Sequence, residues 1–165
     1  MRDAKGDTVP DESLILLASE VRGKTLRLLD GVSDSEARFT PAGLNNTILW
    51  HAGHALVVVE HLSVAPATGA LPSYPPGWFE TFSWKSVPAT VTRWPALAEV
   101  VERLRDQLTR LRVAIEALPP ERLAGMLPNN RTLRYSILHG LHDEAGHQGE
   151  IYLLRKMLRV GKPKA

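Results

Sequence analysis

Asp143 and His147 are the residues of this sequence whose types and spacing point most directly to chemistry. They stand four residues apart near the C-terminus, in a stretch with the apolar spacing of a core-facing helix. A helix turns by roughly 100° per residue, so both side chains lie on one face, with Cβ atoms roughly 5–6 Å apart. A carboxylate and an imidazole placed in this way can reach one cation. His142 lies about 140° around the helix from His147 and faces a different neighbour.

A metal site needs at least a third ligand from elsewhere in the fold, and residues 45–62 are the obvious source. This segment is largely apolar, yet it carries three of the six histidines, His51, His54 and His61. A buried imidazole costs free energy unless it has a hydrogen-bond partner or a metal. His54 and His61 lie two turns apart on one face, and His51 is about 60° around the helix from His54. The residues alone leave a metal site and hydrogen-bonded core histidines as equal alternatives.

Further polar residues near the Asp143–His147 pair suggest supporting roles. His139 and Glu150 lie on the same broad face as Asp143, so they either hydrogen-bond to the metal ligands or form a solvated stripe. Glu150 lies nearer to the metal-binding face and is a candidate catalytic proton acceptor. Glu144 is expected on the surface.

The composition narrows the class of protein. A chain of 165 residues is long enough to bury a core, and we expect one domain over residues 1–165. The absence of cysteine excludes a disulfide scaffold, a zinc ribbon and a cysteine nucleophile, and a cytoplasmic location is the default expectation. Residues 1–10 have no apolar core typical of a signal or anchor, and no apolar run reaches the roughly 18 residues that span a bilayer.

The charge pattern gives little support for nucleic acid or membrane partners. The formal net charge is only +2. Basic residues gather at the C-terminal end, where they complement a helix dipole and keep the chain soluble. A nucleic-acid surface would interleave aromatic side chains with the basic ones, and only Tyr152 is near. The residues of this basic cluster are Arg155, Lys156, Arg159, Lys162 and Lys164.

The apolar spacing predicts an all-α fold with four long helices and no strands. Ser33 to Glu36 fits a capping box that opens a short turn, and Pro119-Pro120 ends the third long helix. The four expected helices span residues 12–29, from a cap at Asn45 or Asn46 to about 63, about 95–118, and about 133–160.

The connection between the second and third helices, residues 64–94, is unusually long and rich in proline and aromatic residues. Its prolines, beginning with Pro66, are expected to forbid a long helix. A four-helix bundle whose second and third helices run parallel needs such a crossover. The aromatic side chains are expected to pin the crossover to the bundle, to line a substrate pocket, or to do both. They are Tyr74, Trp78, Phe79, Phe82 and Trp84.

With these motifs in place, the sequence resembles the DinB-like family of metalloenzymes, which includes the YfiT-like proteins and thiol-dependent S-transferases. The resemblance covers nearly the whole chain. It is carried by Trp50-His51-Ala52-Gly53-His54, by Pro-Pro-Gly-Trp at 75–78, and by the run from His142 to Glu150, which is the most specific of the three.

The resemblance implies an up-down-down-up four-helix bundle with a central divalent metal. Matched residue by residue, its ligands are His54, Asp143 and His147. The commonest family pattern has a histidine where this chain has Asp143, but two histidines and a carboxylate are also a standard ligand set. Zinc or nickel is the expected metal, with manganese or iron as alternatives.

The leading hypothesis is a metal-dependent transferase that activates a small-molecule thiol for attack on an electrophile. A metal-dependent hydrolase is one alternative. A non-catalytic bundle that binds metal for stability, or acts through oligomer contacts, is another. The apolar faces of the first and fourth helices predict a homodimer, which is compatible with any of these functions.

Overall fold

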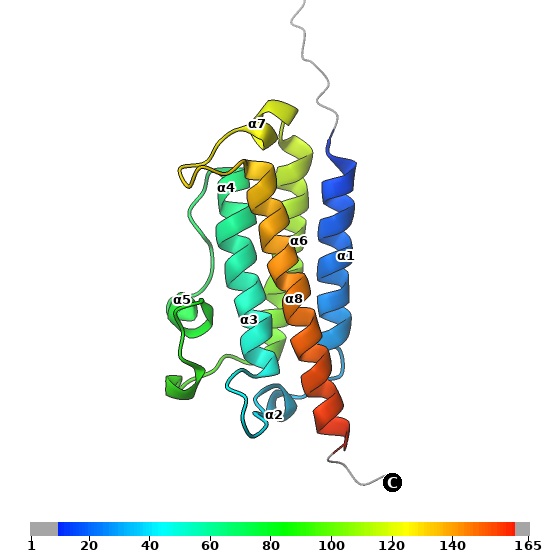
Figure 1. Ribbon diagram of the computed structural model, residues 1–165, viewed down its shortest axis with the longest axis vertical. Coiled ribbons are helices and arrows are strands. Elements are labelled where there is room, and N and C mark those ends of the chain that lie inside the picture. The colour runs from blue at the N-terminus through cyan, green and yellow to red at the C-terminus, as the bar shows by residue number, and fades with distance from the viewer. Residues whose placement is uncertain (1–9, 161–165) are drawn as a thin grey trace, which may run out of the picture.

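The structure is a computed structural model that describes residues 10–160, and it confirms the all-α class. Four long helices lie side by side (Figure 1), and no strand occurs within this range. In the view of Figure 1, α1 and α8 run downward, whereas α3 and α6 run upward. α8 and α6 each pack against both α1 and α3, which closes the four helices around a common core. Their bounds are α1 Glu12–Leu29, α3 Ile48–Val59, α6 Leu97–Ala117 and α8 Leu133–Val160.

Two predictions fall partly outside the part of the chain that the structure describes. The first is the prediction that residues 1–10 form no signal or anchor, of which residues 1–9 are not described. The second is the C-terminal basic cluster, of which Lys162 and Lys164 are not described.

Side-chain caps fix where the first helices begin. The Asp11 carboxylate accepts from the Leu14 backbone N–H at 3.0 Å and starts α1. The predicted capping box is confirmed, because Ser33 and Glu36 exchange both hydrogen bonds at the start of α2 (Asp34–Ala37).

The predicted asparagine cap of the second long helix was wrong. The cap of α3 is Thr47, whose extended backbone lets its hydroxyl accept from the Trp50 N–H at 3.0 Å. Asn45 and Asn46 precede this residue in the connecting loop.

The second long helix also continues further than predicted. α3 passes through a π-helical stretch, Glu60–Val64, into α4 (Ala65–Thr68) and ends at Gly69, whose φ is 72°. Pro66 was expected to end the helix, because proline has no N–H to donate to a carbonyl of the preceding turn. Instead, the Leu62 carbonyl accepts a hydrogen bond from the Ser136 hydroxyl of α8 at 2.6 Å. A neighbouring helix thus satisfies a backbone group that the wider turn and the proline leave free.

The continuous helix Ile48–Thr68 is long and apolar enough to cross a membrane by length and composition, which the sequence analysis did not expect. However, 89% of its most apolar window is buried inside the bundle. This burial makes it a core helix of the bundle.

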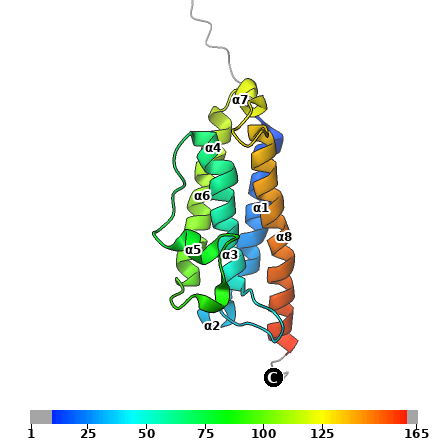
Figure 2. The ribbon, with the colours of Figure 1, turned by 60° about the vertical axis from the view of Figure 1, so that its left-hand side comes forward.

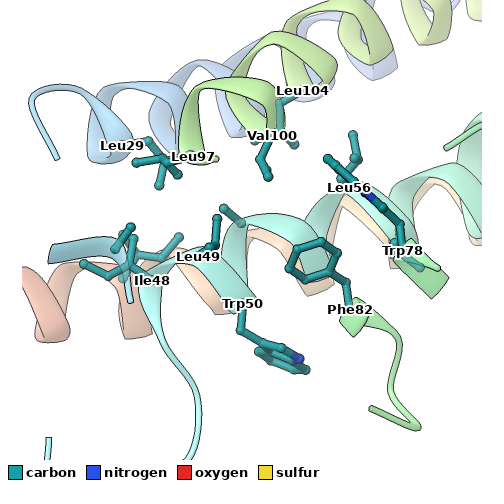
Figure 3. Close-up of a cluster of buried hydrophobic side chains, with 14 of the residues drawn as sticks. Leu29, Ile48, Leu49, Trp50, Leu56, Trp78, Phe82, Leu97, Val100 and Leu104 are labelled. Atoms are coloured by element: carbon teal, nitrogen blue, oxygen red, sulfur yellow. The ribbon is translucent and has the colours of Figure 1, made fainter. Parts of the chain in front are cut away.

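The long crossover packs four of the five aromatic residues between 74 and 84 against the bundle, whereas Trp84 is exposed. It contains α5 (Trp78–Phe82), which lies against α3 (Figure 2), and a short 3-10 turn at Pro88–Thr90. Trp78 and Phe82 are buried in one core cluster with Trp50, Leu56 and residues of α6 (Figure 3). The crossover is therefore part of the core at this end of the bundle. α7 (Pro120–Ala124) links α6 to α8.

Gly53 on α3 makes this close packing of α5 possible. A Cβ atom at this position would lie 2.3 Å from the Phe82 ring, far inside van der Waals contact. The absence of a side chain at Gly53 lets Phe82 lie directly on the backbone of the helix that carries His51 and His54.

Candidate metal centre

Three side chains converge between α3 and α8 in the arrangement that a metal ion requires. His54, Asp143 and His147 each offer a ligand atom, and these atoms lie within 4.8 Å of one another. Asp143 Oδ2 is 3.7 Å from His54 Nε2 and 3.5 Å from His147 Nε2. The structure thus brings together all three residues that the sequence analysis named as ligands.

The distances fit shared coordination better than direct hydrogen bonding. Nitrogen and oxygen ligands about 2.0–2.1 Å from a tetrahedral zinc ion lie roughly 3.3–3.4 Å from each other. The two observed separations are slightly longer than this and are too long for good N–H···O hydrogen bonds. Within residues 10–160, Asp143 Oδ2 is the buried side-chain oxygen that has no hydrogen-bond partner. A buried carboxylate oxygen without a donor is costly, and a cation would satisfy it.

The ring of His54 is held in the orientation and tautomer that a ligand needs. Its Nδ1 lies 2.6 Å from the Phe82 carbonyl oxygen. A carbonyl can only accept, so Nδ1 carries a hydrogen, and in this tautomer of the neutral ring the lone pair is on Nε2. The Trp50 ring stacks on His54 at a centroid distance of 4.5 Å and covers one face of the imidazole. The crossover, through Phe82, therefore orients a candidate metal ligand as well as filling the core.

The ring of His147 has a second histidine as its partner. The Nδ1 atoms of His147 and His51 are 2.8 Å apart, and His51 is almost fully buried. Burial lowers the pKa of His51 to about 3, and the nearby His147 and His54 rings add to this effect. Burial also lowers the pKa of His147, assisted by His54 and opposed by Asp143. Both rings are therefore neutral at pH 7, as a histidine must be to bind a metal.

The expectation that Glu144 lies on the surface was wrong. Its carboxylate is completely buried in the interior of the bundle. Arg22 of α1 donates to its two oxygens at 2.8 and 2.9 Å, and the Thr25 hydroxyl donates at 2.6 Å. The Arg22 guanidinium also donates to Gln107 Oε1 and to the Leu104 carbonyl. Glu144 therefore joins α8 to α1 and α6 instead of facing solvent.

A second buried carboxylate, Glu60, extends this polar network across the bundle. Gln107 Nε2 donates to Glu60 at 2.7 Å, and Arg110 donates to both of its oxygens. The Ser73 backbone N–H also donates to Glu60, which fixes the start of the crossover. This network was not predicted from the sequence, although a signal was present. Polar residues occupy core-facing positions in the apolar stripes of all four long helices, namely Arg22, Glu60, Gln107 and Glu144.

Other polar residues considered in the sequence lie outside the three-ligand group. Glu150 is exposed, but it lines a cavity of about 380 Å³ together with His51 and His147. His61 donates to or accepts from the Tyr74 hydroxyl at 2.6 Å, away from the site. His139 is exposed and stacks on Tyr135. His142 is exposed.

The fold is that of a known class of helical proteins. The family model of the DinB superfamily matches residues 17–151, and the chain belongs to this superfamily. A solved structure described as a conserved protein from Enterococcus faecalis is similar, with a TM-score of 0.68 and 15% sequence identity. The match covers 92% of this chain and 97% of that protein, and at this identity it supports the fold alone. None of the curated proteins matches the chain.

Proposed function

We propose that this protein is a metal-dependent enzyme that transfers a small-molecule thiol to an electrophile. The observation that carries the proposal is the convergence of two imidazole nitrogens on a buried carboxylate oxygen that has no donor within residues 10–160. Two histidines and one carboxylate suit zinc or nickel best, and manganese or ferrous iron are compatible. Three protein ligands leave room for a further ligand, as catalytic sites do and closed structural sites do not.

A bound divalent cation would supply Lewis acidity, which lowers the pKa of a thiol or water beside it. The chain's own residues have three tasks. His54, Asp143 and His147 hold the ion, and the Trp50 ring covers one face of the His54 imidazole. Glu150 faces the cavity beside His147 and is the proposed acceptor of the thiol proton. The resulting thiolate forms a bond to the electrophilic carbon, and the leaving group departs with its electron pair.

The first test is metal content, because every further step depends on it. Protein purified without a histidine tag should contain, or take up from zinc, nickel or manganese solutions, close to one ion per chain. Asp143→Asn should lose this ion, because the substitution replaces a charged ligand oxygen with a neutral amide. His142→Asn is the matched control, since this neighbouring histidine is exposed and lies outside the ligand group. Wild-type protein that takes up none of the three metals would contradict the proposal.

The second test is turnover. Loaded protein should consume a low-molecular-weight thiol in the presence of a chromogenic electrophile such as chlorodinitrobenzene, and Asp143→Asn should not. Glu150→Gln should retain the metal but react more slowly at neutral pH, by about 10²–10⁴-fold if this carboxylate is the proton acceptor. Hydrolysis of ester or amide substrates without thiol consumption would favour the hydrolase. Metal-dependent heat stabilisation without any turnover would favour a structural role for the ion.

A homodimer is a further part of the proposal. Several large apolar side chains on the outer surfaces of α1 and α8 are exposed, and a second copy could cover them. They include Leu16, Tyr135, Leu138, Tyr152 and Leu153. Light scattering coupled to gel filtration would give twice the chain mass for a dimer, and a monomer at micromolar concentration would exclude one.

A further inference from the structure

His51 and His147 face each other through their Nδ1 nitrogens. The two Nδ1 atoms are 2.8 Å apart, which is a hydrogen-bond distance. Two neutral imidazoles can make this contact in only two ways. Either His147 donates through Nδ1 and His51 accepts, or His51 donates and His147 accepts.

Only one of these arrangements leaves His147 able to bind a metal. When His147 donates through Nδ1, its Nε2 carries a lone pair directed toward Asp143 Oδ2, 3.5 Å away. When His51 donates instead, the hydrogen of the neutral His147 ring is on Nε2 and blocks the metal-binding position. The direction of this one hydrogen bond therefore decides whether the three-ligand site is complete.

We propose that His51 is a positioning residue, which accepts the Nδ1 hydrogen of His147 and so fixes the ring and tautomer that present Nε2 to the metal. The inference rests on the proposed metal site. It gives α3 two roles, because this helix supplies the ligand His54 and, one turn earlier, the residue that orients the ligand from α8. His54 itself is oriented in the equivalent way by the Phe82 carbonyl. Each histidine ligand thus has its own acceptor.

The geometry argues against His51 as a fourth ligand at the same centre. Its Nδ1 contacts the nitrogen of His147 that lies on the far side of the ring from Nε2. His51 is also absent from the group whose ligand atoms converge. With an exposed fraction of 4%, it is held by the surrounding core, so little reorganisation is needed for it to act as an acceptor.

The affinity for zinc, measured by competition with a chromophoric chelator, tests the inference without any activity assay. His51→Phe keeps an aromatic ring but removes the acceptor, and we expect it to weaken zinc binding by about 10–100-fold with one ion still bound per chain. His51→Asn places an amide oxygen near the former Nδ1 and should recover most of this loss. His61→Phe is the control, because it removes a half-buried histidine of the same continuous helix whose partner is Tyr74. Its zinc affinity should equal that of the wild type.

Nitrogen-15 NMR of the histidine rings in zinc-loaded wild-type protein provides a second readout that needs no variant. The Nδ1 hydrogen should belong to His147, and His51 should carry its hydrogen on Nε2. Wild-type protein that binds zinc while His51→Phe binds it equally well would overturn the inference and leave the metal site intact. A hydrogen on His51 Nδ1 in the loaded protein would also overturn it, even if His51→Phe failed to fold. If the wild-type protein does not bind zinc, the result contradicts the proposed function and therefore this inference as well.

Discussion

Neutralising Glu144 should destabilise the protein far more than neutralising any carboxylate at its surface. Glu144→Gln keeps the size of the side chain but leaves the guanidinium of Arg22, only 2% exposed, without its counter-charge. The glutamine amide also replaces one of the two oxygens with an NH2 group, so at least one donor of Arg22 then faces another donor. Removing one partner of a buried ion pair costs about 3–5 kcal/mol, which is a large part of the total stability of a domain of this size.

Urea unfolding followed by circular dichroism would measure this cost. Glu99→Gln is the matched control, because Glu99 pairs with Arg103 one turn away on the exposed face of α6. That change should cost less than about 0.5 kcal/mol. The double variant Arg22→Met/Glu144→Gln should recover part of the loss, since it removes the stranded charge as well.

A loss of less than about 1 kcal/mol in Glu144→Gln would refute this reasoning, because it would mean that water reaches Arg22 and screens its charge. A double variant as unstable as the sum of the two single variants would also contradict it. In that case Arg22 and Glu144 would not act as a pair.

Two further predictions concern the elements around the site. Gly53→Ala should lower both stability and zinc affinity, because the new methyl group displaces Phe82, whose carbonyl orients His54. Overpacking costs about 1–3 kcal/mol, which exceeds the gain in helix propensity of up to about 1 kcal/mol. Urea unfolding would measure the stability, and chelator titrations would measure the zinc affinity. Burial lowers the pKa of His61 below its ordinary 6.5, despite the opposing charge of Glu60. As the pH falls, the His61 ring is therefore protonated at a higher pH in the unfolded chain than in the folded one. The free energy of unfolding should therefore fall as the pH drops below about 6.5, and it should fall less in His61→Phe, as urea titrations at pH 7.5 and 5 would show.

Local periodicity was sufficient to predict the helices and the pairing of Asp143 with His147. These features depend on residues close in sequence, whose relative directions the helix fixes. The choice of His54 among three histidines of one segment needed the family resemblance, because periodicity alone leaves the direction of each ring open.

The contacts that complete the site could not be predicted, since they join distant parts of the chain. The Phe82 carbonyl meets His54 only because the crossover folds back on α3, and the facing of His51 and His147 depends on how α3 and α8 are rotated. The continuation of the helix past Pro66 likewise depends on Ser136 of another helix. Each of these is a tertiary hydrogen bond that overrides or completes a local preference.

Asp143 and Glu144 show how adjacent carboxylates can have opposite relationships to the folded state. Glu144 accepts three hydrogen bonds at 2.6–2.9 Å, so the folded protein itself satisfies this carboxylate and no cation is needed. Asp143 directs a buried oxygen at two imidazoles without a hydrogen bond from any residue between 10 and 160, which costs stability unless a cation is present. Without metal, Asp143→Asn should therefore be as stable as the wild type or more so, whereas Glu144→Gln should be much less stable. Added zinc should stabilise the wild type and not Asp143→Asn. Marked destabilisation of metal-free Asp143→Asn would mean that this carboxylate is a structural group like its neighbour, and the case for a metal centre would lose its main support.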